Sequence, residues 1–169
     1  EIYLLDARGE ILQQLTISWS IDVSPSWSPD GQKLAYVSNR AGKPQIYVLD
    51  LSTKRSTRLT FEGDYNTSPA WSPRGDRILY AGLHDGRFDI FMINPDGSEL
   101  RQLTGGEGNN ENPCWSPDGR LILFQSDRRG TPTLWVMQAN GMDQRRLRLN
   151  LGDSQTEPDW SPRLTRATP

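Results

Sequence analysis

The chain has 169 residues, a length that fits one domain, and its 19 Lys and Arg nearly balance its 21 Asp and Glu. The basic residues are dispersed along the sequence, which does not favour a nucleic-acid-binding function. No run of 18 apolar residues occurs, so the sequence predicts no membrane span. A single cysteine, Cys114, excludes an intrachain disulfide, and we expect it to be a small buried side chain.

A motif built around Trp-Ser-Pro recurs along the chain. Its tryptophans, Trp27, Trp71, Trp115 and Trp160, lie 44, 44 and 45 residues apart. A fixed period of this length is typical of solenoids, propellers and repeat arrays. Each period reads as four short strands joined by hairpin-length loops, and its Ser-Pro-x-Gly segment suits a type I turn. The sequence therefore predicts a series of small up-and-down antiparallel sheets.

The apolar pattern of each strand predicts how these sheets stack. The second and third strands, such as residues 78–81 and 134–137, are apolar on both faces, so both faces should be covered. The first strand carries a proline two residues before each tryptophan, which suits an edge, and the fourth strand is charged. We therefore predict an all-β fold of four-stranded β-propeller blades. The tryptophans should serve packing and not ligand binding.

The repeats predict about three complete blades plus partial blades at each end, all in one propeller domain. In chain order they are the outer two strands of a partial blade at 1–16, blades at 23–60, 67–104 and 111–149, an inner strand of a last blade at 155–162 and a tail at 163–169. Propellers usually close with four to eight blades. We therefore expect a fragment of a longer propeller, or a homodimer that closes the ring.

Polar residues recur at two positions ahead of each tryptophan, in loops expected to open on one end of the propeller. Five residues before it stand Asp22, Asn66, Asn110 and Gln155. Three residues before it stand Ser24, Ser68, Asn112 and Glu157. The loops between the second and third strands, which should open on the same end, are basic. These polar residues could satisfy turns in their own loops or bind an extended segment of a partner, and both readings are compatible.

The sequence predicts neither a catalytic site nor a metal site. His84 is the only histidine, so no histidine base–nucleophile pair and no histidine-based metal set can be built. There is no Gly-x-Ser-x-Gly elbow and no local pair of carboxylates suited to acid and base roles. The Asp- and Asn-rich loops could hold Ca²⁺, although no Asp-x-Asp-x-Asp-Gly loop is present. We expect a non-enzymatic protein without a cofactor.

The repeat as a whole resembles the propeller repeats of the TolB family. It reads Asn/Asp-x-x-Pro-x-Trp-Ser-Pro-Asp-Gly, then an apolar strand, a Ser-x-Arg-x-Gly loop, Ile-Tyr-x-x-Asp and Leu-Thr, and the segment 157–164 looks like the last strand of TolB chains. The resemblance implies a periplasmic, non-catalytic, protein-binding scaffold of the Tol-Pal cell-envelope system. In that family the propeller face binds the peptidoglycan-associated lipoprotein Pal.

The resemblance also implies where a partner binds, namely in the loop before the inner strand, just ahead of the proline. The matching residues are Tyr65, Asn66, Thr67 and Ser68 in one blade and Asn109, Asn110, Glu111 and Asn112 in the next, with Asp22, Ser24, Ser154 and Glu157 as weaker equivalents. Two positions depart from the family pattern: the first copy reads Ser20-Ile-Asp-Val, and the second has His84 where the other blades have arginine.

Two other functions compete with this one. Similar repeats form the substrate-gating propellers of prolyl-oligopeptidase-type serine peptidases, a function that would need an α/β-hydrolase domain after the propeller. No such domain follows within these 169 residues. The other alternative is a generic extracytoplasmic propeller with an unknown ligand.

Overall fold

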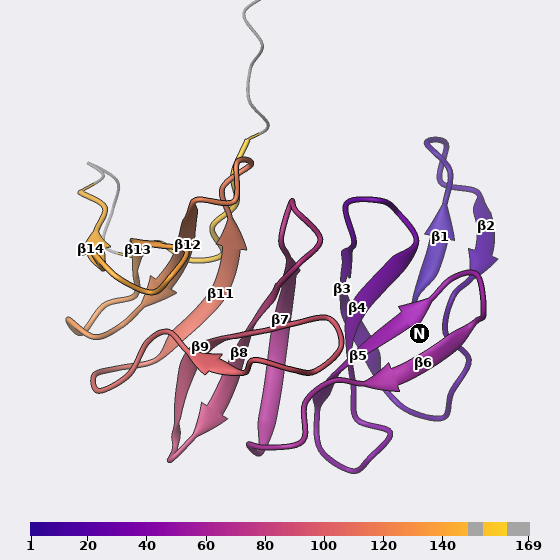
Figure 1. Cartoon of the computed structure of the whole chain (residues 1–169), viewed down its shortest axis with the longest axis horizontal. Helices are drawn as coiled ribbons and strands as arrows, with labels where there is room; N and C mark the ends of the chain where they lie inside the picture. Colours follow the sequence, from indigo (N-terminus) through magenta and orange to yellow (C-terminus); the bar gives the residue numbers. More distant parts are fainter. Residues whose placement is uncertain (149–153, 162–169) are drawn as a thin grey trace, which may run out of the picture.

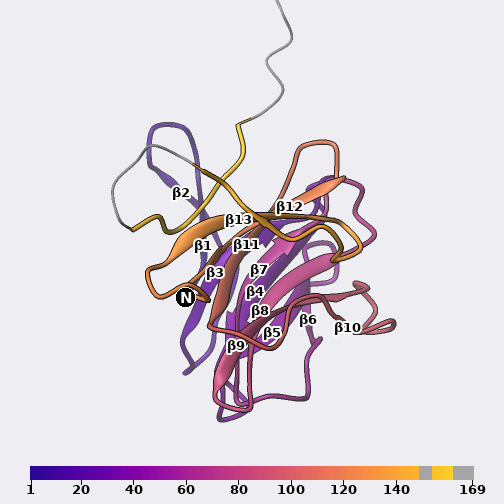
Figure 2. The same cartoon turned by 90° about the vertical axis from the view of Figure 1, so that its left-hand side faces the viewer.

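The computed structural model describes residues 1–148 and 154–161, in which every regular element is a β-strand. The strands form one two-stranded and three four-stranded antiparallel sheets, each in sequence order, which follow one another across the molecule (Figure 1). The view along this row shows the inner strands β3, β7 and β11 lying one behind another (Figure 2). The predicted all-β fold built from four-stranded propeller blades is confirmed.

We number the four-stranded sheets as blades 1 to 3. The two-stranded sheet that precedes them holds β1 (Tyr3–Leu5) and β2 (Ile11–Gln14). Blade 1 holds β3 (Asp22–Trp27), β4 (Lys33–Ser38), β5 (Gln45–Asp50) and β6 (Arg55–Arg58). Blade 2 holds β7 (Tyr65–Trp71), β8 (Ile78–His84), β9 (Arg87–Ile93) and β10 (Arg101–Gln102). Blade 3 holds β11 (Asn110–Trp115), β12 (Leu121–Ser126), β13 (Thr133–Gln138) and β14 (Arg145–Arg146).

The last predicted inner strand differs from expectation. Residues 154–161 form no strand, although the backbone N–H of Gln155 donates to the Pro132 carbonyl at 2.9 Å. In blades 1 to 3 the inner strand is held by a hairpin partner, β4, β8 or β12, and no such partner pairs with this segment among the described residues. Residues 149 and 162 and the predicted tail 163–169 lie outside the described residues.

Each inner strand ends in the predicted Ser-Pro-x-Gly turn. In blade 2 the Gly75 amide donates to the Ser72 carbonyl at 2.9 Å, which closes the turn. Gly75 has a φ of 78°, a conformation that a side chain disfavours, and a Cβ there would lie 3.3 Å from the Pro29 ring of blade 1. The turns of neighbouring blades therefore touch, and glycine allows both the backbone conformation and the contact.

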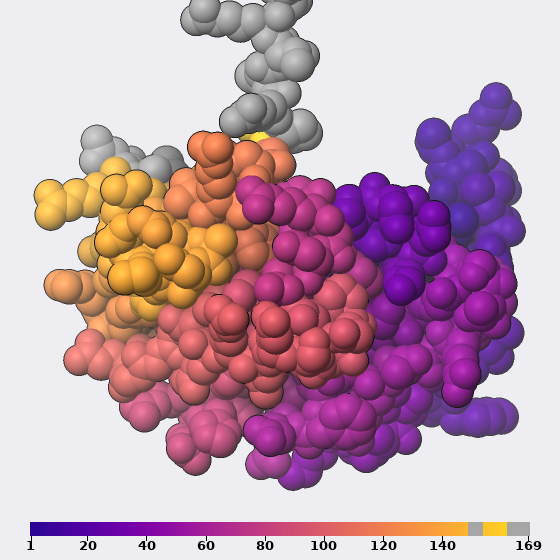
Figure 3. All heavy atoms as spheres, in the orientation of Figure 1, coloured from indigo at the N-terminus to yellow at the C-terminus, as the bar shows by residue number. Residues whose placement is uncertain are grey.

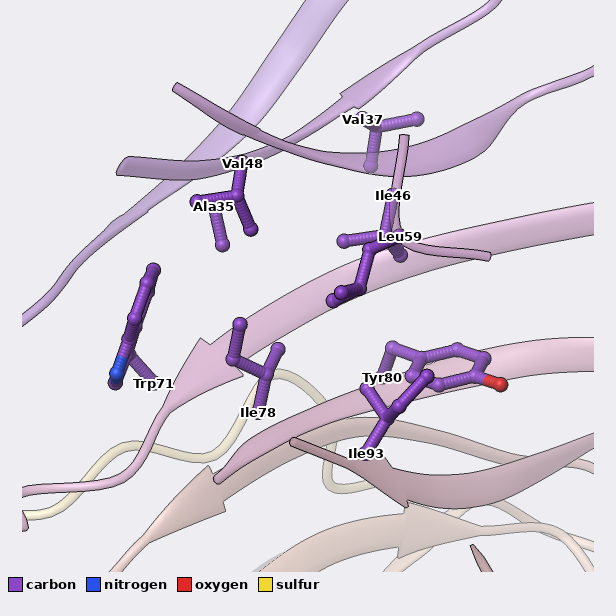
Figure 4. Packing of buried hydrophobic residues seen from close by; sticks show 9 residues of the cluster. All are labelled: Ala35, Val37, Ile46, Val48, Leu59, Trp71, Ile78, Tyr80 and Ile93. Carbon is purple, nitrogen blue, oxygen red and sulfur yellow. The ribbon is translucent and has the colours of Figure 1, made fainter. Parts of the chain in front are cut away.

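The hydrophobic core lies between consecutive blades. Between blades 1 and 2 it consists of Ala35, Val37, Ile46, Val48, Leu59, Trp71, Ile78, Tyr80 and Ile93 (Figure 4). Between blades 2 and 3 it consists of Leu79, Ala81, Ile90, Met92, Ile122, Phe124, Trp135 and Met137. Alternate residues of β8 thus face opposite neighbours, which is why this strand is apolar on both faces.

The predicted packing role of the tryptophans holds in blade 2 and is wrong in blade 1. Trp71 is 8% exposed and packs against blade 1, whereas Trp27 is 43% exposed. The difference follows from the neighbours, because the sheet before blade 1 has only the strands β1 and β2. Large exposed apolar side chains gather at this end of the molecule, which is indigo and purple in Figure 3: Tyr3, Leu5, Ile11, Leu12, Ile17, Trp19, Ile21, Val23 and Trp27.

The two equivalent tryptophans provide a test of this packing. Replacement of Trp71 by alanine should lower the free energy of unfolding by about 3–5 kcal/mol, because it leaves a cavity between two blades. Replacement of Trp27 should cost at most about half as much, because part of its surface is already in water. Urea unfolding of both variants measures the difference. Equal losses would show that the burial of Trp71 is not what stabilises the contact between the blades.

Candidate functional site

The two sets of loops lie at one end of the blades, which we call the loop face. It is formed by the loops that enter β3, β7 and β11 and by those that join the second and third strands of each blade. The backbone N–H of Ile21 donates to Asn39 Oδ1 at 2.8 Å in blade 1, and the backbone N–H of Asn109 donates to Asp127 Oδ1 at 2.6 Å in blade 3. These bonds join the two sets of loops, which therefore form one surface.

The polar residues five positions before each tryptophan are buried, and we call them the buried set. Asp22, Asn66 and Asn110 are at most 2% exposed, and Gln155 is also buried. The family resemblance implies that Asp22, Asn66 and Asn110 contact a partner, but their buried side chains present almost no surface for such a contact. Their amide and carboxylate groups are instead used inside the protein, where an unpaired polar group would be costly.

Residues of the buried set join consecutive blades through hydrogen bonds that we call the inter-blade staple. Gln45 Oε1, at the start of β5, accepts bonds from Thr60 Oγ1 at 2.8 Å and from Asn66 Nδ2 of blade 2 at 2.9 Å. One blade further on, Asp89 Oδ1 accepts bonds from Thr104 Oγ1 at 2.8 Å and from Asn110 Nδ2 of blade 3 at 2.9 Å. A single oxygen thus binds both the segment that follows the outer strand of its own blade and the inner strand of the next blade.

The staple predicts different effects of two substitutions at Asp89. Asp89→Leu should lower the free energy of unfolding by about 2–3 kcal/mol, because it leaves the Thr104 hydroxyl and the Asn110 amide without an acceptor. Asp89→Gln should cost less than about 1 kcal/mol, since glutamine occupies the equivalent position 45 and accepts the same two bonds there. Thermal or urea unfolding measures both variants. Similar losses in both would contradict the acceptor role.

Arginines of the basic loops reach the buried set within their own blade. Arg40 Nη2 donates to Asp22 Oδ2 at 3.1 Å, and Arg128 Nη2 donates to Asn110 Oδ1 at 2.6 Å. Each guanidinium also lies over two aromatic rings of its blade. Arg40 and Arg128 therefore stabilise their own blades, so not all of the basic loop residues are available to bind a partner.

Asp22 is held in its ionised form. Burial raises the pKa of this carboxyl, but hydrogen bonds from Ser38 and Ser18 together with the positive charge of Arg40 outweigh burial, so that the pKa is lowered from its usual value. A carboxyl with a lowered folded pKa contributes stability above its unfolded pKa, which is about 3.9. That contribution disappears as the pH falls through the folded pKa.

The variant Asp22→Asn tests this linkage. At pH 7 it should be less stable than the parent chain by about 1–3 kcal/mol, because the Arg40 guanidinium loses its carboxylate. The difference should shrink as the pH falls below about 4 and the parent's carboxyl becomes protonated. Unfolding curves measured from pH 7 to pH 2.5 follow both proteins. A difference that is independent of pH would contradict an ionised Asp22.

The residues three positions before each tryptophan, which we call the bulge set, are the more accessible group. Ser24, Ser68, Asn112 and Glu157 all have a φ between 51° and 53°, and in blades 1 to 3 the strand register shifts there. A bulge redirects a side chain out of the regular ladder. Ser24 and Glu157 are exposed, and Ser68 and Asn112 are half-buried. The recurrence of a polar residue before proline was the sequence signal for this feature.

Hydrogen bonds run across blades within the bulge set. Ser68 Oγ donates to Asn112 Oδ1 at 2.8 Å, Asn112 Nδ2 donates to Gln125 Oε1 at 3.2 Å, and the Glu157 amide donates to the same Gln125 oxygen at 3.3 Å. Glu111 accepts from Gln125 Nε2 at 3.3 Å. This connected polar strip follows the inner strands and can exchange hydrogen bonds with an extended ligand.

The other predicted site residues surround this strip. Tyr65 is 42% exposed and meets Phe88 edge to face with ring centroids 5.9 Å apart. Thr67 and Asn109 are half-buried, and Ser154 is exposed. Asn109 is engaged with Asp127 through its backbone and its side chain. The structure therefore places Tyr65 and the bulge set where a partner could reach them, and places Asn66, Asn110 and Asp22 beneath.

Metal-binding clusters and a reactive thiol were the chemical groups to look for among the described residues. In residues 1–148 and 154–161 there is no cluster of three or more His, Cys, Asp or Glu side chains that could hold a metal ion. Burial, with a contribution from the Asp159 carboxylate, raises the pKa of Cys114 to about 12, so that this thiol is protonated at neutral pH and is a poor nucleophile. No helix able to cross a membrane occurs among the same residues.

Comparison with known proteins gives the family. A family model described as the TolB beta propeller domain matches residues 1–164. The chain belongs to the TolB β-propeller family. Among curated TolB relatives, a "Protein TolB homolog" from Chlorobium chlorochromatii is 58% identical over 40 residues, 24% of this chain and 9% of that protein. The "Tol-Pal system protein TolB" of Bordetella pertussis is 48% identical over 46 residues, 27% of this chain and 10% of that protein.

Solved TolB structures share the fold. TolB from Acinetobacter baumannii superposes with a TM-score of 0.77 and 29% identity over 90% of this chain and 38% of that one. A putative TolB from Agrobacterium tumefaciens superposes with a TM-score of 0.73 and 31% identity over 83% of this chain and 50% of that one. The chain thus spans half or less of these TolB proteins. A prolyl endopeptidase, 18% identical with a TM-score of 0.62, shares the fold alone.

Proposed function

We propose that this TolB-family propeller is a non-catalytic periplasmic scaffold of the Tol-Pal system that binds the lipoprotein Pal through its loop face. The observation that carries the proposal is the accessible polar strip of the bulge set, flanked by Tyr65, on a propeller whose relatives include a "Tol-Pal system protein TolB". Scaffold loops carry binding functions more often than strands do.

The chemistry of the loop face suits a protein partner. Tyr65 combines a partly exposed ring with a polar hydroxyl, and tyrosine is enriched among residues that dominate protein–protein binding. Ser68, Asn112 and Gln125 already form hydrogen bonds between blades, so their positions are fixed before a partner arrives. A preorganised surface loses less entropy on binding.

The gating propeller of a serine peptidase is the weaker alternative. Its support is the shared fold with a prolyl endopeptidase at 18% identity, which carries no information about activity. The Asp- and Asn-rich loops of the loop face support a separate proposal, Ca²⁺ binding, which calorimetry with Ca²⁺ tests.

The proposal predicts saturable binding between this chain and the periplasmic domain of Pal, measured by isothermal titration calorimetry. Tyr65→Ala should weaken that binding about tenfold, which corresponds to a loss of about 1.4 kcal/mol. Tyr65→Phe keeps the edge contact with Phe88 and removes only the hydroxyl, so it separates packing from hydrogen bonding.

The control is Arg74→Ala, which removes an exposed side chain from the Ser-Pro-x-Gly turn at the opposite end of the blade. It should bind Pal as the parent chain does. Absence of binding by folded protein, or equal weakening by Tyr65→Ala and Arg74→Ala, would contradict the placement of a Pal site on the loop face.

A further inference from the structure

The three blades allow an internal comparison of one local arrangement, an arginine held over a pair of aromatic rings. In blade 1 the Arg40 guanidinium carbon lies 5.5 Å from the centre of the Tyr36 ring and 4.9 Å from that of Tyr47. In blade 3 the Arg128 guanidinium carbon lies 5.6 Å from the centre of Phe124 and 4.5 Å from that of Trp135. Both are within the range of a cation–π interaction.

Both guanidinium groups donate to a serine hydroxyl and to an oxygen of the buried set, and Arg128 Nη1 also donates to Gln144 Oε1 at 2.9 Å. Arg40 Nε donates to Ser38 Oγ at 2.9 Å while its Nη2 reaches Asp22. Arg128 Nε donates to Ser126 Oγ at 2.9 Å while its Nη2 reaches Asn110. Blades 1 and 3 therefore share one binding geometry for a guanidinium: two aromatic rings, a serine hydroxyl and an oxygen of the buried set.

Blade 2 retains the two rings and the buried oxygen of this geometry and lacks both the arginine and the serine. Its equivalent rings, Tyr80 and Phe91, lie 44 residues from those of blades 1 and 3 and are stacked with centroids 5.4 Å apart. His84 replaces the arginine; its side chain is 58% exposed and lies beside Asp85. Gly82 replaces the serine, and a Cβ there would come within 2.7 Å of Asn66 Oδ1.

A cavity of about 130 Å³ lies at this place, lined by Glu62, Asn66, Tyr80, Gly82, His84 and Phe91 among others. Asn66 is 2% exposed, and its Nδ2 donates to Gln45 and to the Glu62 carbonyl. Asn66 Oδ1, the atom that corresponds to the Arg128 acceptor in blade 3, faces the space that Gly82 leaves open. An acceptor that faces a cavity can receive a hydrogen bond from a ligand.

We propose that this cavity binds the guanidinium of an arginine side chain presented by a protein partner on the loop face. The inference that the arginine belongs to a protein partner rests on the proposed function, whereas the cavity and the kind of ligand it binds are inferred from the comparison of the three blades. Asn66 Oδ1 accepts one guanidinium N–H, and the rings of Tyr80 and Phe91 contact the planar cation. Glu62, which also lines the cavity, carries the opposite charge. A planar guanidinium fits this geometry better than the compact ammonium of lysine.

A small probe tests the cavity without any partner protein. We expect N-acetyl-arginine amide to shift the backbone NMR signals of residues 62–66, 82–84 and 91 in a saturable way. The citrulline analogue, which has the same shape and no charge, should bind at least about tenfold more weakly, because it lacks the cation. Equal binding of both compounds, or no shift at these residues, would overturn the proposal.

One variant inside the cavity and one far from it supply the matched control. His84→Arg places the chain's own guanidinium where blades 1 and 3 have theirs, so it should fill the cavity and weaken binding of the probe at least about tenfold. Arg74→Ala, at the opposite end of the blade, should bind the probe as the parent chain does. His84→Arg should also melt at a higher temperature than the parent chain, since Asn66 Oδ1 gains a donor. Unchanged probe binding by His84→Arg would overturn the assignment.

The same variants separate this inference from the proposed function. If Pal binds and His84→Arg weakens Pal binding while Arg74→Ala does not, the partner's arginine occupies the cavity. If the probe binds and Pal does not, the guanidinium site stands and the proposed function fails. If Pal binds equally well to all three proteins, Pal recognition stands and the proposed arginine contact is wrong.

Discussion

The inter-blade staple is the interaction on which the rest of the structure depends. Each blade buries its apolar faces against its neighbours, and such contacts alone tolerate sliding, since they have no direction. The bond from Asn66 to Gln45, and its repeat from Asn110 to Asp89, fixes each inner strand against the third strand of the preceding blade. Hydrogen bonds are directional, so the two staples fix how blades 1, 2 and 3 lie against one another at the loop face.

The fold could be predicted from the sequence because its signals are local and repeated. The 44-residue period, the two-sided apolar strands and the Ser-Pro-x-Gly turn each specify structure within one blade. The burial of Asn66 and Asn110 could not be predicted in the same way. An asparagine in a loop has the same sequence signal whether its side chain is in water or donates to an acceptor 21 residues away. The exposure of Trp27 was missed for a related reason, since it depends on the neighbouring sheet and not on the residue itself.

The candidate site was predicted only in part. Recurrence of a polar residue before proline located the bulge set, but recurrence alone did not separate the accessible bulge set from the buried set two residues earlier. That distinction follows from the backbone, since the positive φ at Ser68 and Asn112 breaks the alternation of an ordinary strand. The sequence shows that His84 replaces the arginine of the other blades. The cavity at this position could not be predicted, because only the folded chain brings the aromatic rings and the Asn66 oxygen together.

The short sequence distance covered by each staple has a consequence for how the chain folds. Asn66 and Asn110 bond to partners only 21 residues earlier, so the contact between blades needs no remote part of the chain. Loop-closure entropy for such a distance is modest, and local contacts are associated with fast folding. Each blade can therefore use the finished edge of its predecessor as a template. During synthesis each new blade would then pack on the blade made before it.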